Sequence, residues 1–462
     1  MGERKGSRPR FSFNRSVRLA RHDEQLSSTA GVLLLRELDE RWKILSLLVE
    51  QLHDPRRPGR TTWPLLVQLR TRIFALAAGF SSQRQAASLA SDPLVRLSSS
   101  ELRGTSPLFD SADISQPTLA RMHRVLGLEQ NQRALSDALF DLGWRVIREA
   151  TQAAGGPHTI DVDSMPVMSH GQQPGSVWNG YYRGRCFHPL MALHGETGTL
   201  LGARLRPGNV QASEEARDFV LDVVERFERG NGSSVLVRGD SGFANGPMLE
   251  ALEARGTRYI FRVGKNPILE RLAQPYLERL RKRAKLPRER VYSLSYCGRR
   301  SPKDRRVLLV IQEKPGELFP HTFFLITNDR CSKPKTILER YRQRGTSESR
   351  FGELKSRLEP KLSCTSRKGD EAREAAWRAN VSTYQLYMLA DGLLHALRWL
   401  SKKDLSSDGE SLPRLQRVQR ILIDVAARVT RSARRIHVHV AESASDAWVR
   451  LLSRLGRLRP VT

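Results

Sequence analysis

The sequence lacks the features that would place it in a membrane or in an oxidising compartment. No stretch approaches the ~18 consecutive apolar residues that a membrane-spanning helix requires. Residues 1–21 are basic and contain no apolar segment of a secretory signal. Only four cysteines occur, and none forms a CxxC pair, which argues against a zinc ribbon and against a disulfide scaffold (Cys186, Cys297, Cys331, Cys364). These absences predict a cytoplasmic protein with reduced thiols.

Acidic residues are scarce relative to basic ones. The chain of 462 residues has 77 Lys and Arg against 49 Asp and Glu, which gives a formal net charge of +28. Such a balance favours a polyanionic partner, because each neutralised phosphate releases counterions. Charge alone also fits a non-specific RNA-associated protein, such as a ribosomal one. The length allows two or three domains with a substantial core.

Hydrophobic spacing divides the first half of the chain into three regions. Residues 1–29 are rich in Arg, Ser and Pro and are expected to form a basic flexible arm. Residues 30–155 carry apolar residues at spacings of three and four, typical of helices. We expect a helical DNA-binding domain there, and a helical scaffold with solvated charges is the alternative. Residues 156–264 indicate the order β-β-β-α-β-α-β, which predicts a mixed sheet with crossover helices.

The second half of the chain begins with a strongly basic segment. Residues 265–334 indicate a charged helix followed by three strands, and we expect a β-rich insertion subdomain that interrupts the sheet. Residues 276–306 contain twelve Lys or Arg and three Asp or Glu, which favours contact with DNA over a merely solvated surface. Residues 335–400 are expected to be helical, including one helix over 335–358. Residues 401–462 form a C-terminal region, with helix expected over 415–432.

Aspartates stand at the ends of two predicted strands. Asp161 and Asp163 lie in the strand at 159–163, and alternation puts both carboxylates on one face. Asp163 is nearer the carboxyl end and better placed to project beyond the sheet, while Asp161 is its rival. Asp240 follows an apolar strand in a glycine-flanked turn, where functional acids of α/β sheets gather. The alternative role for such acids is to cap a turn or a helix.

A third set of polar residues lies in the helix expected over 335–358. Tyr341, Arg344, Glu348 and Lys355 are spaced by three, four and seven residues, which predicts one shared helical face. For any single pair an ordinary salt-bridged face is the stronger explanation, but the pattern of four residues favours a metal-and-phosphate site. Clustered carboxylates suit Mg²⁺, which prefers oxygen ligands. Two such ions can activate a nucleophile and stabilise a leaving oxygen in phosphoryl transfer.

The pattern Tyr-x2-Arg-x3-Glu-x6-Lys resembles the YREK signature of bacterial insertion-sequence DDE transposases of the insertion sequence four superfamily. Within it, the chain looks like the thirteen-eighty branch. Further blocks resemble that group and spread the similarity over about residues 30–455 (160–164, 169–173, 179–182, 205–210, 237–243). One position departs from the pattern, because Met165 stands where the family often has Thr.

The resemblance implies an α/β fold with an RNase H-like mixed-sheet catalytic core. A β-rich insertion would interrupt this core, and a helical N-terminal domain and a mostly helical C-terminal region would flank it. Asp163, Asp240 and Glu348 would be the catalytic residues and the ligands of two Mg²⁺ ions, for which Mn²⁺ can substitute. Tyr341, Arg344 and Lys355 would contact the terminal DNA phosphates.

The resemblance also implies the activity: cleavage and strand transfer at the ends of an insertion sequence, by cut-and-paste. The partners would be double-stranded DNA, both the element's terminal inverted repeats and the target, and a second copy of the chain in a synaptic homodimer. A metal-dependent nuclease without joining activity and a catalytically inactive DNA-binding relic are the alternatives.

Overall fold

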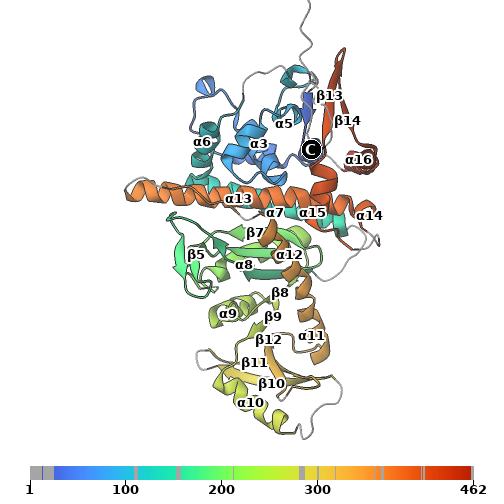
Figure 1. Cartoon of the computed structure of the whole chain (residues 1–462). Coiled ribbons are helices and arrows are strands. Elements are labelled where there is room, and N and C mark those ends of the chain that lie inside the picture. The colour runs from blue at the N-terminus through green and yellow to red at the C-terminus, as the bar shows by residue number, and fades with distance from the viewer. Residues whose placement is uncertain are drawn as a thin grey trace, which may run out of the picture.

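The molecule is elongated, with helices at one end and a large sheet at the other (Figure 1). Two long helices, α7 (Glu129–Thr151) and α13 (Asp370–Leu400), cross between these parts. Residues 1–12 and 14–24 of the basic flexible arm expected at 1–29 lie outside the described residues, whereas its end forms the strand β1 (Gln25–Ser27). The computed structural model describes residues 13, 25–108, 113–151, 158–211, 213–279, 287–298, 301–317, 319–358, 360–365, 369–406, 408 and 411–458.

The centre of the sheet is a meander joined to two parallel strands. The meander is antiparallel and consists of β2 (His158–Ser164), β6 (Leu190–His194) and β7 (Thr199–Arg204). Then α8 (Ala216–Asn231) leads to β8 (Val235–Gly239), which is parallel to β2. Finally α9 (Gly246–Ala254) leads to β9 (Arg258–Val263), parallel to β8. The prediction of a mixed sheet with this order of elements is confirmed.

The strands expected to interrupt the sheet in fact extend it. β12 (His321–Thr327) pairs antiparallel with β9, and β11 (Ser301–Glu313) and β10 (Arg288–Gly298) continue outward. The resulting eight strands have the order β10-β11-β12-β9-β8-β2-β6-β7. Before β10 lies α10 (Pro267–Glu278), capped by the Asn266 side chain. The charged helix was expected to run on to residue 290, and this is wrong at its end, because residues 288–290 belong to β10. Residues 280–286 lie outside those described.

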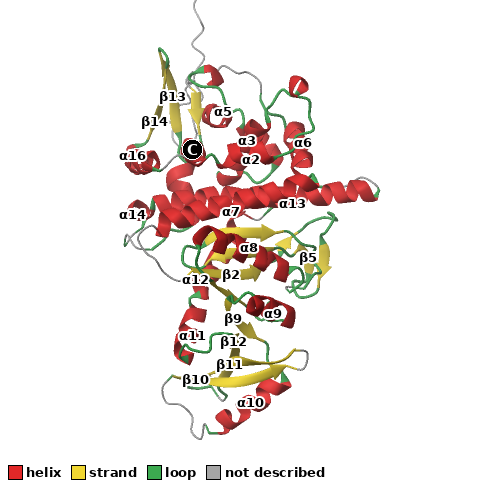
Figure 2. Cartoon of the chain, turned by 180° about the vertical axis from the view of Figure 1, so that it is seen from behind, coloured by secondary structure: helices red, strands yellow, loops and turns green. Residues whose placement is uncertain are grey.

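The two faces of the sheet are covered by different helices. Ile160, Val162 and Val237 belong to the core that includes α8 and α9. On the other face, Leu236 packs in a cluster with Ile337 of α11 (Pro334–Arg342). Because alternate residues of a strand point to opposite faces, Asp161 and Asp163 face the side of α11 and α12 (Arg344–Leu358). Figure 2, which views the molecule from the side opposite to Figure 1, shows α8 and α9 in front of the sheet.

The remaining helices form one core with α13. These are α1 (Val32–Trp42), α2 (Ile44–Gln51), α3 (Leu65–Ala77), α4 (Gln83–Leu89), α5 (Pro93–Ser99) and α6 (Gln116–Leu126). The buried α13 contacts α3 and α7 as well as β7, so it joins the helical part to the sheet. No helix among the described residues combines the length and the apolarity needed to cross a bilayer.

The C-terminal region folds back onto the N-terminal helices. After α14 (Lys402–Leu405) and α15 (Leu415–Val418), a short π-helical turn ends at Ile423. The helix expected over 415–432 is therefore wrong in its second half, which is β13 (Ala427–Ser432). Its alternating buried and exposed residues fit a strand, and it pairs with β14 (Arg435–Val440) and β1 (Gln25–Ser27). The last helix, α16 (Glu442–Arg457), packs on α1.

A small second sheet lies beside the main one. It has the order β3-β5-β4 and consists of β3 (Val167–Met168), β4 (Val177–Asn179) and β5 (Gly184–Phe187). Since β3 follows β2 after two residues, this sheet borders the carboxyl end of β2. That is the end at which Asp163 lies.

Candidate active site

Asp161 is a buried structural anchor in the middle of β2. Its two carboxylate oxygens accept hydrogen bonds from Nε and Nη2 of Arg238, both at 2.7 Å. The Ser347 hydroxyl donates to the same carboxylate at 2.5 Å. Asp161 is fully buried and Arg238 is 2% exposed. A carboxylate that is already neutralised by a bidentate guanidinium and shielded from water is poorly placed to bind a metal ion.

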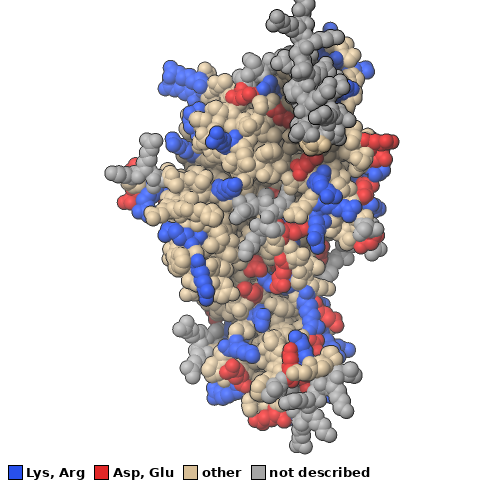
Figure 3. Space-filling view, in the orientation of Figure 1, with Lys and Arg blue, Asp and Glu red and all other residues tan. Residues whose placement is uncertain are grey.

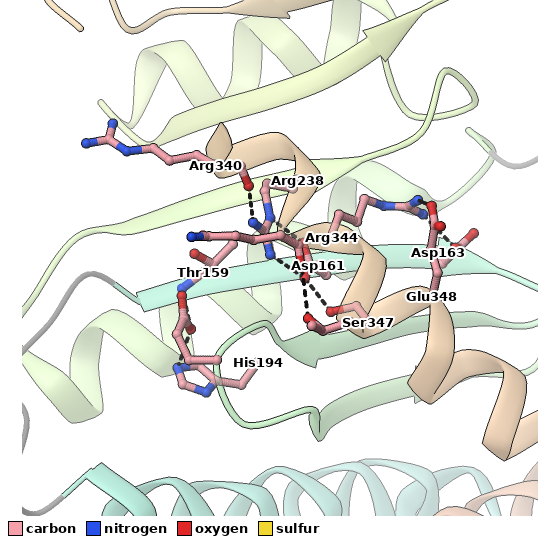
Figure 4. Close-up of polar contacts among 12 residues, drawn as sticks. Thr159, Asp161, Asp163, His194, Arg238, Arg340, Arg344, Ser347 and Glu348 are labelled. Carbon is pink, nitrogen blue, oxygen red and sulfur yellow. Dashed lines mark hydrogen bonds and ion pairs between the residues drawn. The ribbon is translucent and has the colours of Figure 1, made fainter. Parts of the chain in front are cut away.

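Asp163, two residues further along β2, is open to solvent and has a different environment. Its side chain is 22% exposed, and its Oδ2 accepts a hydrogen bond from Nη2 of Arg344 at 2.6 Å. Nη1 of the same guanidinium donates to Oε1 of Glu348 at 2.5 Å, and Glu348 is 62% exposed. Arg344 thus bridges two of the candidate ligands (Figure 4). One cation is thus shared between the carboxylate of Asp163 and that of Glu348.

Asp240 lies directly after β8, the parallel neighbour of β2. Its Oδ1 accepts the Gly242 N–H at 2.8 Å, which fixes the turn that follows the strand. The carboxyl ends of β2 and β8 share one edge of the sheet, and the charge of Asp240 acts on Asp163. Burial raises the pKa of Asp163 from 3.8 to about 6, with Asp240 adding to the rise and Arg344 opposing it. Burial and the charge of Asp240 together therefore outweigh the effect of Arg344 on the pKa of Asp163.

The four residues expected on one helical face are divided between two helices. Tyr341 lies in α11, which ends at Arg342, whereas Arg344, Glu348 and Lys355 lie in α12. The expectation of one helix over 335–358 is therefore wrong. Arg238 explains the break: its Nη1 donates to the carbonyl of Arg340, which residue 344 would use in an uninterrupted helix.

Tyr341 nevertheless remains close to the acids. It is half-buried against the cluster that contains Leu338. Burial raises the pKa of its phenol, and the charges of Asp240 and Glu348 add to this while Arg344 opposes it. The side chain of Lys355 falls outside the described part of the chain. The structure thus brings Asp163, Asp240, Glu348, Arg344 and Tyr341 into one neighbourhood.

The three candidate acids do not converge on one point. The described residues contain one group of three possible metal ligands with all donor atoms within 4.8 Å of one another, and it is a different group. Carboxylates repel one another unless a cation lies among them, and here the guanidinium of Arg344 separates Asp163 from Glu348. The donor set still fits a hard divalent cation: oxygen ligands, partial exposure and a carboxyl with a raised pKa.

Sequence reasoning missed Arg238 and Ser347, which fix the geometry of this edge. A signal for Arg238 was present, because it is the one charged residue in the apolar strand 235–239. A buried arginine requires hydrogen-bond acceptors, and Asp161 on the neighbouring strand supplies a carboxylate. Ser347 carried no such signal, since exposed serines are common in helices.

Figure 3 shows how charge is distributed around this edge. Acidic side chains gather in the middle of the face, around the position of α12. Lysine and arginine side chains lie above and below this group, over both the helical part and the sheet. Such a pattern suits a polyanion that approaches a cation-binding acidic centre along basic flanks.

The chain belongs to the family "Transposase DDE domain group 1", whose family model matches residues 10–460. This membership makes it a DDE transposase, of a class of enzymes that cut and rejoin DNA phosphodiesters and generally use divalent metal ions. DNA is accordingly its partner.

Two other comparisons add nothing to this assignment. One solved structure with a similar arrangement is described as the piggyBac transposase synaptic complex with hairpin DNA. It shares 15% sequence identity and a TM-score of 0.38, over 85% of this chain and 79% of that chain. A likeness this weak carries no argument about mechanism. No curated protein matches the sequence.

Proposed function

We propose that the protein catalyses metal-dependent cleavage and strand transfer at the ends of an insertion sequence, with Asp163, Asp240 and Glu348 as its catalytic carboxylates. The observation that carries this proposal is the contrast between the two acids of β2. Asp161 is buried and paired with Arg238, whereas Asp163 is partly exposed and electrostatically coupled to Asp240. Only Asp163 is free to exchange its present partner for a cation.

The arrangement of strands supports the RNase H-like core that the sequence resemblance implies. Asp163 and Asp240 lie at the carboxyl ends of two parallel neighbours, and Glu348 lies on α12, the second helix after β12. Tyr341, Arg344, Glu348 and Lys355 would then be the YREK residues of the insertion sequence four superfamily, in its thirteen-eighty branch. We therefore infer a bacterial insertion-sequence transposase that acts on nucleoid DNA in the cytoplasm.

Asp163, Asp240 and Glu348 would hold two Mg²⁺ ions, which Mn²⁺ can replace. When bound, the ions would polarise the scissile phosphate and stabilise the charge on the entering and leaving oxygens. Arg344 has a role that the structure supports. Its Nε is buried without a hydrogen-bond partner, and its two other nitrogens hold Asp163 and Glu348. Once cations neutralise these acids, the guanidinium can donate to a terminal DNA phosphate.

The expected organisation of the chain provides further DNA contacts. We propose that residues 30–155 bind DNA, because arginines line a surface pocket of this helical part (Arg56, Arg57, Arg60, Arg121). The basic segment at 265–334 would follow the DNA backbone. The substrate would be the terminal inverted repeats and then the target, held by a homodimer in a synaptic complex, with the element moved by cut-and-paste.

Incubation of the purified protein with Mg²⁺ or Mn²⁺ and a plasmid carrying the element's own ends tests this function. We expect double-strand breaks at the ends and joined products in a second plasmid. Cleavage without joined products would favour a nuclease. DNA binding without cleavage in either metal would favour an inactive relic, and either outcome would overturn the proposal.

A further inference from the structure

A second cluster of polar side chains lies at the opposite end of β2 from Asp163. His158 begins β2, His194 ends the antiparallel neighbour β6, and Glu196 lies in the turn between β6 and β7. His158 Nδ1 is 3.0 Å from His194 Nε2, and Glu196 Oε2 is 3.1 Å from that same nitrogen. The three donor atoms all lie within 4.8 Å of one another. Figure 4 shows His194 at this end of the strand, away from Asp163 and Glu348.

The hydrogen bonds around His194 determine which of its nitrogens carries the proton. The Thr197 hydroxyl donates its only hydrogen to Thr199 Oγ1 at 2.8 Å. Thr197 Oγ1 must therefore accept its 2.8 Å bond from His194 Nδ1–H. In a neutral imidazole this leaves Nε2 without a proton. An unprotonated Nε2 then lies 3.1 Å from the carboxylate oxygen of Glu196.

Two acceptors 3.1 Å apart repel each other unless a proton or a cation lies between them. His158 Nδ1–H can donate to His194 Nε2, but that bond does nothing for the contact with Glu196. A divalent cation resolves the conflict, because all three atoms can then donate lone pairs to it. His194 is fully buried and Glu196 is 40% exposed, so the cluster is open to solvent at Glu196.

The surroundings of the cluster have the features of a metal site. A metal-bound histidine usually donates its second ring N–H to an oxygen, as His194 does to Thr197. The Thr159 N–H donates to Glu196 Oε2 at 3.0 Å and orients that carboxylate. The ring of Phe227 lies 5.1 Å from that of His158 and 5.7 Å from that of His194, and supplies an apolar wall.

We propose that His158, His194 and Glu196 bind one Zn²⁺ ion, with solvent completing the coordination from the exposed side of Glu196. Two imidazoles and one carboxylate are a set of ligands that zinc accepts, at about 2.0–2.2 Å each. Mg²⁺ prefers an all-oxygen set, so this site and the acidic edge select different ions. The ion ties the start of β2 to the turn after β6. It thereby fixes the strand whose other end carries Asp163.

The test uses the full-length protein stripped of metal and titrated with Zn²⁺ in excess Mg²⁺ against a chromophoric zinc chelator. We expect one tightly held Zn²⁺ per chain in the wild type and in Asp163→Asn, because the acidic edge is separate. Glu196→Gln and His158→Asn should lose the tight site. Thr197→Val should weaken binding by about 10–100-fold, the usual effect of removing the hydrogen-bond partner of a ligand.

A matched control separates this site from surface histidines. His437 and His439 form another histidine pair, with rings 6.3 Å apart on the exposed side of β14. His437→Asn should leave the zinc stoichiometry unchanged. Co²⁺ in place of Zn²⁺ should give the visible absorption of a low-coordinate nitrogen–oxygen site, which Glu196→Gln abolishes. These readouts do not depend on DNA cleavage, so they stand apart from the proposed function.

Two results would overturn the proposal. One is a wild type that holds no more zinc than Glu196→Gln in the chelator competition. The other is an NMR spectrum in which both ring nitrogens of His194 carry protons and do not respond to Zn²⁺. In that case an imidazolium, not a metal ion, satisfies Glu196.

Discussion

Replacing each acid of β2 in turn should separate a structural carboxylate from a metal ligand. Asp161→Ala removes the partner of Arg238, which is 2% exposed, and of the Ser347 hydroxyl, which is also buried. Breaking a buried ion pair from one side costs about 3–5 kcal/mol, because the remaining charge is buried without compensation. We therefore expect Asp161→Ala to lower the free energy of unfolding by this amount.

Asp163→Ala should behave in the opposite way. The Asp163 side chain is 22% exposed, and without it Arg344 still holds Glu348. Its removal should not lower the free energy of unfolding by more than about 1 kcal/mol. It should, however, weaken the binding of Mn²⁺ at the acidic edge, because one of the oxygen ligands is lost.

Urea denaturation in EDTA measures the stability of both variants, and Mn²⁺ titration followed by electron paramagnetic resonance measures binding. The double variant Asp161→Leu with Arg238→Met serves as the control, because replacing both partners by apolar residues should restore most of the stability lost in Asp161→Ala. The assignment would be refuted if Asp161→Ala remained as stable as the wild type and lost Mn²⁺, while Asp163→Ala kept it.

Three further predictions concern charge. Folding raises the pKa of Asp163 from 3.8 to about 6, so the folded state binds its proton more tightly than the unfolded state does. The metal-free protein should therefore lose stability as the pH rises from 4 through 6. In EDTA at pH 8, Asp163→Asn should thus unfold at higher temperature than the wild type, by about 1–3 kcal/mol in free energy, and an equal or lower temperature would contradict this. Burial alone would raise the pKa of Glu253. Hydrogen bonds from Arg305, Lys303 and Tyr259 outweigh this effect and lower that pKa to about 2. The ionised Glu253 therefore stabilises the fold above pH 4.5, and this stabilisation is lost as the pH falls toward 2. Glu253→Gln should be less stable than the wild type by roughly 1–2 kcal/mol at pH 7 and equally stable in acid. A difference in the free energy of unfolding that stays constant with pH would contradict this. Arg344→Lys should keep Mn²⁺ binding and weaken the complex with the DNA ends in a gel-shift assay, because an ammonium cannot make paired contacts; unchanged DNA binding would show that Arg344 serves the carboxylates alone.

The sequence pattern was sufficient to predict the strands of the sheet but not the contacts of the acids at its edge. Alternation placed Asp161 and Asp163 on one face of β2, and this is correct, since both contact residues of α12. It could not tell which acid is buried, because that depends on Arg238 from a strand 77 residues away. The break between α11 and α12 was hidden for the same reason. Arg238 donates a hydrogen bond to the Arg340 carbonyl, and local helix propensity gives no information about that contact.

Pairing between strands far apart in the sequence also explains the other differences between the predicted and the observed fold. The strands after α10 were correctly expected, but their joining of the main sheet depends on the pairing of β12 with β9. In the C-terminal region, β13 is completed by β1 from the start of the chain. His158 and His194 lie 36 residues apart in the sequence and belong to separate strands. Only the antiparallel pairing of β2 and β6 brings them together.

The most direct test of the catalytic assignment is a change of metal specificity. Asp163→Cys and Asp240→Cys replace oxygen ligands by thiolates, which bind Mg²⁺ poorly and Mn²⁺ better. Cleavage of the element's ends by these variants should be lost in Mg²⁺ and partly restored in Mn²⁺, with no such rescue for Asp161→Cys. If the cysteine variants cleaved fully in Mg²⁺, or if Mn²⁺ rescued Asp161→Cys alone, the assignment of Asp163 and Asp240 as metal ligands would be wrong.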